Sequence, residues 1–202
     1  MATRRATYHH GDLKNGLIKV ALELIAESGA ESFTLREAAR RLGVNHRAVY
    51  RHFEDKRSLL AAVAEQGFAQ LTEQGGKERA RWPEDQVIER LLGMGVAYVR
   101  FAIAHPGHFR VMFGPRLNED GRFPALEEEV TRAFRSLEAE VTRGIELRVF
   151  KGVSVRDGAL TLWSAMHGFA SLVLMRRIRV RKDRLAEFTE RIIGPTLRGL
   201  GP

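Results

Sequence analysis

The stretch LREAARRLGVNHRAVYRHFEDKRSLLAAV, residues 35–63, decides the fold because it encodes two short amphipathic helices joined by a tight turn. Thr34 and Glu37 have the spacing of a capping box, in which each side chain bonds to a backbone N–H group at a helix start. Gly43 then predicts the end of this first helix. Because only residues 43–45 separate it from the next helix, the two helices must cross steeply.

The second helix of the pair follows Asn45, a preferred N-cap residue, and is expected over residues 46–53. Val49 and Phe53 share its apolar face because they lie four positions apart. The opposite face is polar and is formed by His46, Arg47, Tyr50 and Arg51. Such a helix fits the major groove of DNA, where its first turn reaches base edges while the crossing helix braces it. Any helical hairpin with a polar face shows the same pattern, which leaves plain solvent exposure open.

Helical periodicity on both sides of this stretch predicts an all-α fold of about nine helices with no strand. Apolar residues recur every three to four positions from Leu13 to Ile25, and Gly29 ends this first helix. From residue 54 onward, caps and helix breakers predict helices over residues 54–71, 83–104, 106–113, 124–148, 154–175 and 184–200.

The glycine pair at residues 75–76 predicts a boundary between two domains. The N-terminal domain takes residues 1–75, with a helix-turn-helix core at about 12–60, and the helical C-terminal domain takes residues 76–202. Residues 158–175 of the second domain carry no formal charge, but interrupting polar residues argue for a helix buried in protein rather than in a membrane. Such a helix must pack on several sides, which a second copy of the chain would allow.

The amino-acid composition limits the cellular compartments and the kinds of binding partner that are expected. None of the 202 residues is cysteine, which excludes disulfides, thiolate metal sites and cysteine nucleophiles and fits a reducing compartment. The first residues have no apolar core of the kind that a secretory signal needs, so we expect a cytoplasmic location. The formal net charge of +8 predicts an anionic partner, with DNA, RNA and a membrane surface as the candidates.

Two basic segments have more than one interpretation. Arg4 and Arg5 are compatible with an arm that enters the minor groove and equally with a plain terminal tail. The arginine-rich residues 176–184 suggest a second anion site, but they follow the charge-free helix and are expected to be a solvated connector that caps its carbonyl end.

The quoted stretch closely resembles the DNA-binding domain of the tetracycline-repressor-like (TetR) family of bacterial regulators, over residues 10–65. The positions that carry this resemblance are Thr34, Leu42-Gly43-Val44, Tyr50, His52-Phe53 and Lys56. The resemblance implies phosphate contacts by Thr34, Tyr50, His52 and Lys56, to which the polar face adds Arg51. It also implies that the bases are read by His46, Arg47 and Ala48. Of these, Arg47 has the paired donors that match a guanine edge.

In the C-terminal domain, Trp163-Ser-Ala-Met-His167-Gly168 and an upstream segment at residues 98–113 resemble the WHG subgroup of TetR regulators. In this family the C-terminal helices form a dimer interface and a pocket for a small effector. The resemblance therefore implies a pocket for an apolar or aromatic effector, lined by Tyr98, Phe101, Phe109, Met112, Phe113, Trp163 and His167. A core tryptophan with a hydrogen-bonded histidine would give the same spacing of Trp163 and His167.

Together these patterns predict a homodimeric, ligand-responsive transcription repressor that binds a palindromic operator in double-stranded DNA. A TetR-like activator, a regulator controlled by a protein partner, and a basic helical protein that coats nucleic acid stay open as alternatives. An enzyme is not expected, because the chain lacks a phosphate-cradling glycine loop and a serine nucleophile elbow. No cofactor and no metal are expected, since His105, His108 and His167 have no carboxylate or thiolate at ligand spacing.

Overall fold

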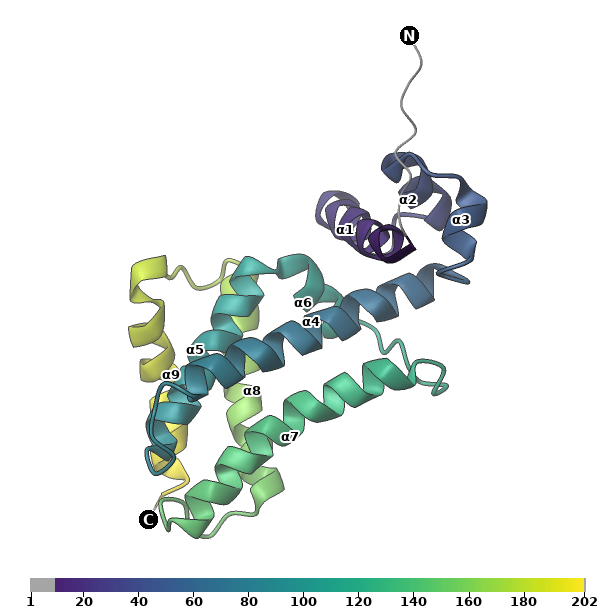
Figure 1. Cartoon of the computed structure of the whole chain (residues 1–202). Coiled ribbons are helices and arrows are strands. Elements are labelled where there is room, and N and C mark those ends of the chain that lie inside the picture. Colours follow the sequence, from purple (N-terminus) through teal and green to yellow (C-terminus); the bar gives the residue numbers. More distant parts are fainter. Residues whose placement is uncertain (1–9, 202) are drawn as a thin grey trace.

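A computed structural model describes residues 10–201, and their side chains from residue 13 onward (Figure 1). Arg4 and Arg5, considered above as a minor-groove arm, lie outside the described residues. No strand occurs in the described part of the chain, which confirms the expected all-α fold. Its nine α-helices are α1 (His10–Ser28), α2 (Leu35–Leu42), α3 (His46–Tyr50), α4 (Lys56–Arg79), α5 (Val87–Ala104), α6 (Pro106–Met112), α7 (Pro124–Glu146), α8 (Val155–Leu174) and α9 (Leu185–Gly199), and a 3-10 helix at Lys182–Arg184 precedes α9.

The caps of α2 and α3 follow the sequence pattern. Thr34 Oγ1 accepts the N–H of Glu37 at 3.2 Å, and Asn45 Oδ1 accepts the N–H of Arg47 at 2.9 Å. Gly43 ends α2 with φ of 72°, a left-handed conformation that glycine adopts without steric cost. α3 ends at Tyr50, three residues before the expected end, because a turn leads from it to the buried Phe53.

Helix α4 is longer than the sequence suggested. Asp55 caps its start in a reciprocal pair of hydrogen bonds with Ser58, and the helix continues through Gly75 and Gly76 to Arg79. The expectation that it fades at the glycine pair is therefore wrong. Two interior glycines cost helix stability, but α4 packs against α1, α5, α6 and α7, and this tertiary packing outweighs the local propensity.

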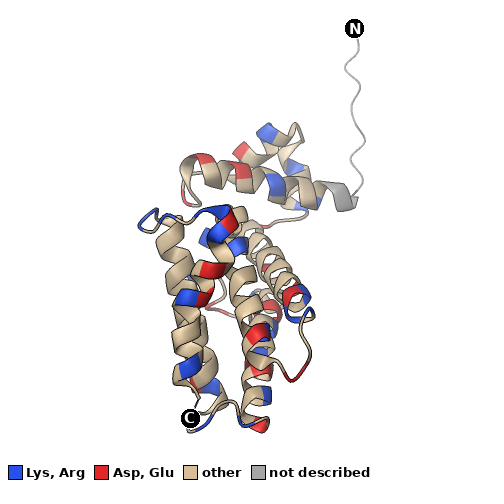
Figure 2. Cartoon of the chain, turned by 90° about the vertical axis from the view of Figure 1, so that its left-hand side faces the viewer, with Lys and Arg blue, Asp and Glu red and all other residues tan. Residues whose placement is uncertain are grey.

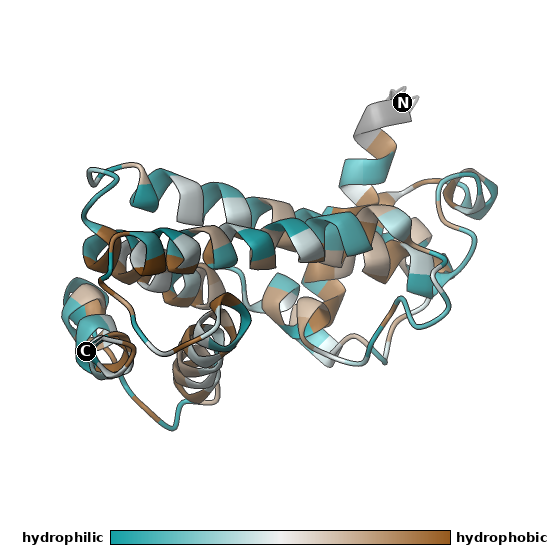
Figure 3. Cartoon of the chain, turned by 90° about the horizontal axis from the view of Figure 1, so that it is seen from below, coloured by the Kyte–Doolittle hydropathy of each residue, from teal (hydrophilic) through white to brown (hydrophobic). Residues whose placement is uncertain are grey.

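Two apolar cores share α4, which connects the small α1–α3 unit to the larger bundle (Figure 1). Phe68 of α4 belongs to the core built on α1–α3, whereas Leu71, one turn later, belongs to the core of the larger bundle. Hydrophobic residues gather between the helices and hydrophilic residues cover their outer faces (Figure 3). The division of the chain at residue 75 stays a prediction.

Helices α8 and α9 pack against each other, and α8 keeps one uncharged face exposed. Arg156 and Asp157 are exposed in its first turn, and the uncharged face that follows is formed by Thr161, Ser164, Gly168 and Leu172. Met175 follows at the C-terminal end of the helix, with 68% of its surface exposed. Acidic and basic residues are interspersed along the helices (Figure 2). Within residues 10–201, no helix is long and apolar enough to cross a membrane.

Candidate DNA interface and effector cavity

Helix α3 presents two of the three predicted base-reading side chains on its outer face. His46 and Arg47 are exposed in its first turn, and Tyr50 is exposed in the last. Val49 is completely buried and anchors the helix in the N-terminal core. Ala48, also predicted to read bases, is half-buried and packs against that core, so only its outer edge faces solvent.

The predicted phosphate-contacting residues lie around the ends of α2, α3 and α4. Thr34 and Arg51 are exposed, and His52 is half-buried. Lys56 donates a hydrogen bond from Nζ to the carbonyl oxygen of Glu31 at 2.9 Å, which brings the start of α4 beside the segment that leads to Thr34. The structure thus places these predicted phosphate contacts at or near the helix ends of residues 34–56, which we name the recognition segment.

An ion pair holds α2 against α1. The guanidinium of Arg41 donates to the carboxylate of Glu27, with an Nη1 to Oε2 distance of 2.6 Å. This hydrogen bond holds the pKa of the Glu27 carboxyl below its usual value. Both side chains are substantially exposed, so the pair contributes little to the stability of the fold.

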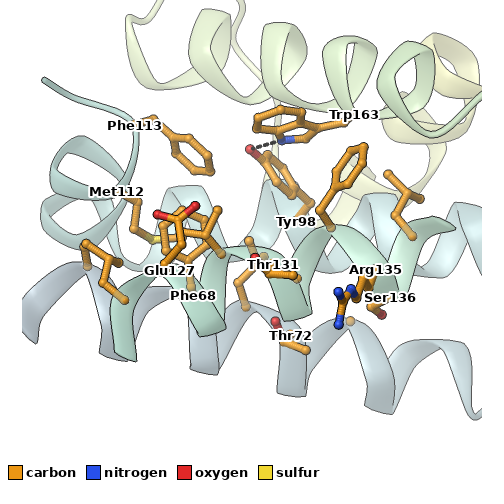
Figure 4. Close-up of a pocket in the computed structure, with 18 of the residues that line it drawn as sticks. Phe68, Thr72, Tyr98, Met112, Phe113, Glu127, Thr131, Arg135, Ser136 and Trp163 are labelled. Carbon is orange, nitrogen blue, oxygen red and sulfur yellow. Dashed lines mark hydrogen bonds between the residues drawn. The ribbon is translucent and has the colours of Figure 1, made fainter. Parts of the chain in front are cut away.

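A cavity of about 780 Å³ lies between α4, α5, α7 and α8, and is bounded by α6 and the α6–α7 loop (Figure 4). Four of the seven predicted pocket residues line it: Tyr98, Met112, Phe113 and Trp163. The other three do not. Phe101 is completely buried in the core, and the rings of Phe109 and His167 stack on each other at 5.3 Å beside Tyr98.

Much of the cavity wall comes from residues that the sequence did not single out. α4 contributes Phe68 and Thr72, and α7 contributes Val130, Thr131 and Phe134 (Figure 4 labels Phe68, Thr72 and Thr131). The apolar stripe of α7, at four-residue spacing, was the available signal for these positions. It indicates a buried face and does not show that the face borders a cavity.

Polar groups are few in the aromatic wall, and Tyr98 is at its centre. The Tyr98 hydroxyl accepts a hydrogen bond from Trp163 Nε1 at 3.3 Å and lies 2.8 Å from His167 Nδ1 (Figure 4 shows the first bond). Burial raises the pKa of Tyr98 and lowers the pKa of His167, so both are neutral at ordinary pH. On the opposite side, the Thr72 hydroxyl is buried without a hydrogen-bond partner.

The cavity walls are held in place by a buried ion pair between α5 and α7. Arg90 donates from Nε and Nη2 to the two carboxylate oxygens of Glu140, at 2.8 and 2.9 Å. Only 7% of the surface of Arg90 and 2% of that of Glu140 are exposed. Arg90 also donates to the carbonyl oxygen of Trp82, so its guanidinium joins α7 to the α4–α5 connection. Bidentate pairing of this kind fixes geometry as well as charge.

Histidines do not form a metal centre in the part of the chain that the structure describes. No group of three or more histidine and carboxylate side chains in residues 10–201 is placed to hold a metal ion. The rings of His105 and His108 lie 5.8 Å apart, and His167 interacts with Tyr98 instead.

Two family models match this architecture. Residues 17–63 match bacterial regulatory proteins of the tetR family, and residues 91–194 match the tetracyclin repressor-like C-terminal domain. A solved structure of a protein with unknown function from Rhodococcus sp. RHA1 superposes with a TM-score of 0.83 at 26% identity, covering 98% of this chain and 100% of that one. The similarity therefore extends over both cores and the helices around the cavity.

Curated relatives are transcription regulators. Tetracycline repressor protein class A from Escherichia coli is 46% identical over 102 residues, which are 50% of this chain and 45% of that protein. The chain thus spans about half the length of this relative. An uncharacterized HTH-type transcriptional regulator of Mycobacterium tuberculosis is 26% identical over 180 residues, which are 89% of this chain and 78% of that one. The chain belongs to the tetR family of bacterial regulatory proteins, whose members are DNA-binding transcription regulators and not enzymes.

Proposed function

We propose that this chain is a homodimeric repressor that leaves a palindromic operator when an apolar or aromatic small molecule occupies the cavity. The main support is that helix α4 borders both sites. Its residues Phe68 and Thr72 line the cavity, and its first residue follows Tyr50 of α3 by six positions. A ligand that displaces α4 therefore moves the recognition segment. Such a regulator acts in the cytoplasm, where its operator is.

The two sides of this function rest on different residues. Arg47 and His46 are exposed at the start of α3, where major-groove readers carry their base contacts. The uncharged exposed face of α8, with its α9 neighbour, supports a two-fold contact that would bring two recognition segments to successive turns of one DNA face. The WHG-type sequence at residues 163–168 lies on α8 and supplies Trp163 to the cavity wall.

The aromatic part of the cavity lining supports an apolar or aromatic ligand. Its largest surfaces are the rings of Phe68, Tyr98, Phe113, Phe134 and Trp163, which favour an aromatic or apolar body. The hydroxyl groups of Tyr98, Thr72 and Thr131 offer a small number of hydrogen bonds that would orient it. A volume of about 780 Å³ is within the range of pockets for drug-sized molecules.

The first test selects an operator and measures how specifically the chain binds it. An operator is selected from random duplexes, and its affinity is compared with that of a scrambled duplex at two salt concentrations. Specific binding, at least about 1,000-fold tighter than binding to the scrambled duplex, supports the proposal, whereas equal affinities contradict it. Light scattering should give twice the 22.8 kDa mass of one chain.

The effector is sought with 1-anilinonaphthalene-8-sulfonate (ANS), an aromatic probe that fluoresces in apolar cavities. Compounds that displace ANS are then tested for release of operator DNA. Val130→Trp, which places an indole in the cavity, should abolish ANS binding and ligand response while operator binding survives. A regulator whose DNA affinity no displacing compound changes would instead be controlled in another way, for example by a protein partner.

A further inference from the structure

The α6–α7 loop, residues 113–123, contacts both proposed sites. Its first part, residues 113–118, lines the cavity. Its second part, residues 120–123, lies against the start of α4 through hydrogen bonds to Arg57, Asp55 and Glu54. This loop therefore contacts the cavity on one side and the end of the recognition segment on the other.

Arg57 of α4 makes the first of these contacts. Its Nε donates to the carbonyl oxygen of Leu117 at 2.7 Å, and its Nη1 donates to the Asp120 carboxylate at 2.8 Å. A second bond from Nη2 to Asp120 makes the pair bidentate. This pairing lowers the pKa of the Asp120 carboxyl below its usual value.

Arg122 makes the second contact, in which the arginine belongs to the loop and the carboxylates lie at the start of α4. Its guanidinium donates to the Asp55 carboxylate at 2.7 Å and to the Glu54 carboxylate at 2.8 Å. Asp55 is the N-cap of α4, so Arg122 binds the residue that starts this helix. Burial raises the pKa of Asp55, but hydrogen bonds from Arg122 and Ser58 outweigh it, and the net pKa is lowered.

One aromatic ring joins the two arginines. The guanidinium groups of Arg57 and Arg122 lie 5.2 and 5.1 Å from the centre of the Phe123 ring. Guanidinium groups at this distance are attracted to the ring face. The ion pairs of the two arginines and the shared ring therefore form one network. We name Arg57, Asp120, Arg122 and Phe123, together with Asp55 and Glu54, the two carboxylates that Arg122 binds, the loop latch.

Asn118 ties the cavity part of the loop to the latch. Its side chain is buried, with 8% of the residue exposed, and its Oδ1 accepts the N–H of Phe123 at 2.6 Å. Its Nδ2 donates to the carboxylate of Glu127, which also lines the cavity, at 3.3 Å. Because Asn118 belongs to the cavity part of the loop and its side chain bonds to Phe123, a shift of residues 114–118 would strain this hydrogen bond.

We propose that the loop latch is the coupling element of this regulator, and that Arg57, Asp120 and Arg122 are positioning residues for DNA binding. With the latch closed, the start of α4 is fixed against α7, and the recognition segment keeps the orientation that the operator needs. An occupant of the cavity displaces residues 114–118, and Asn118 transmits this displacement to the latch. The inference rests on the proposed function, since it assigns the path between the two sites.

Three variants of the full chain test the latch: Asp120→Asn and Arg122→Gln, which remove one partner each, and the swap Arg57→Asp with Asp120→Arg, which restores opposite charges. Lys77→Gln, which breaks the exposed Lys77–Glu73 pair in the last turns of α4, is the matched control. The measurements are operator affinity, thermal unfolding, and hydrogen exchange of the amides of residues 53–58.

The two single variants should bind the operator about fivefold more weakly or worse, with faster exchange at residues 53–58 and an almost unchanged unfolding temperature. The charge swap should recover part of the affinity, which a merely structural effect of the substitutions would not allow. Lys77→Gln should behave as wild type. Variants that bind the operator as tightly as wild type, or that lose affinity only in proportion to lost stability, would overturn the latch.

Binding of ANS provides a second test of the latch, which requires no operator DNA. ANS in the wild-type cavity should speed amide exchange at residues 53–58 and at residues 119–123, and Asn118→Ala should uncouple the two parts by leaving residues 53–58 unaffected. Unchanged exchange at both segments with ANS bound overturns the latch. A wild-type chain that selects no operator instead contradicts the proposed function, so the two failures are distinguishable.

Discussion

The recognition segment and the cavity are built in different ways. Every predicted DNA-contacting side chain lies within residues 34–56, and its exposure follows from its position on a short helix or at a cap. The cavity draws its walls from five helices and a loop between residues 64 and 166. Local pattern therefore describes the DNA-binding surface well, whereas the ligand site exists only after distant helices have packed.

Core substitutions test whether these two regions are one folding unit. Phe33 is buried in the core of α1–α3 and Phe101 in the core around the cavity. Phe33→Ala and Phe101→Ala should each lower the free energy of unfolding by about 3–5 kcal/mol, because a large side chain leaves a void. Since α4 enters both cores, urea unfolding followed by circular dichroism should remain a single transition in each variant. Two separate transitions would show that the regions fold independently.

Lowering the pH should reduce the stability of the chain through protonation of His108. Burial, helped by the charge of His105, lowers the pKa of His108 from 6.5 to about 4, and its Nε2 lies 3.3 Å from Gln66 Oε1. The folded-state pKa lies below the unfolded value, so the unfolded chain takes up the proton first as the pH falls. The stability present above about pH 6.5 should therefore decline by about 2–3 kcal/mol down to pH 4.

Chemical denaturation at several pH values measures this dependence. His108→Gln should flatten the decline between pH 6.5 and pH 4, although His167, whose pKa burial also lowers, should leave a smaller slope. A variant with the full wild-type slope would exclude His108 as the cause. The expected pattern is similar stability of the two proteins at pH 8, with His108→Gln the more stable of the two near pH 4.

Within the recognition segment, Arg47 should read bases and Lys56 should bind phosphate. Arg47→Ala should cost about 1–3 kcal/mol on the selected operator and much less on scrambled DNA, because a guanine pair is lost. Lys56→Ala should weaken both duplexes alike and flatten the salt dependence by about one phosphate contact. Fluorescence anisotropy across a salt series measures both effects. Specificity that survives Arg47→Ala but not Lys56→Ala would reverse the assigned roles.

Substitution of two glycines by alanine should change the free energy of unfolding in opposite directions. Gly43 has a φ of 72° at the turn between α2 and α3, so Gly43→Ala should destabilise the chain by about 1–2 kcal/mol. Gly76 lies inside α4, and nothing stands within 4 Å of its missing Cβ, so Gly76→Ala should stabilise the chain by up to about 1 kcal/mol. Thermal unfolding of the two variants provides the comparison. A stabilised Gly43→Ala chain would mean that this turn tolerates another backbone conformation.

The sequence predicted the recognition segment better than the cavity, because the first depends on local sequence and the second on the packing of distant helices. Caps at Thr34 and Asn45 and the breaker Gly43 located the recognition segment, because each acts over three or four residues. The glycine pair in α4 misled, since packing against distant helices kept the helix intact.

For the cavity, the sequence identified aromatic residues but not which of them face empty space. Tyr98 and Phe101 lie three positions apart on α5, yet one lines the cavity and the other is completely buried. That difference depends on where α7 and α8 cross α5, and no local pattern encodes such a crossing. Thr72 and Thr131 were missed for the same reason.

The contacts of α4 with the α6–α7 loop also limit how genes of this kind can recombine. Asp55 and Arg57 are paired with Arg122 and Asp120, so the two halves of each ion pair are encoded more than 60 codons apart. A crossover anywhere between them, even at the glycine pair where the sequence looks permissive, joins one parent's α4 to another parent's loop. A hybrid made this way inherits an intact DNA-binding helix whose attachment has lost its partners. Viable exchange should therefore move α3, α4 and the loop as one inherited block.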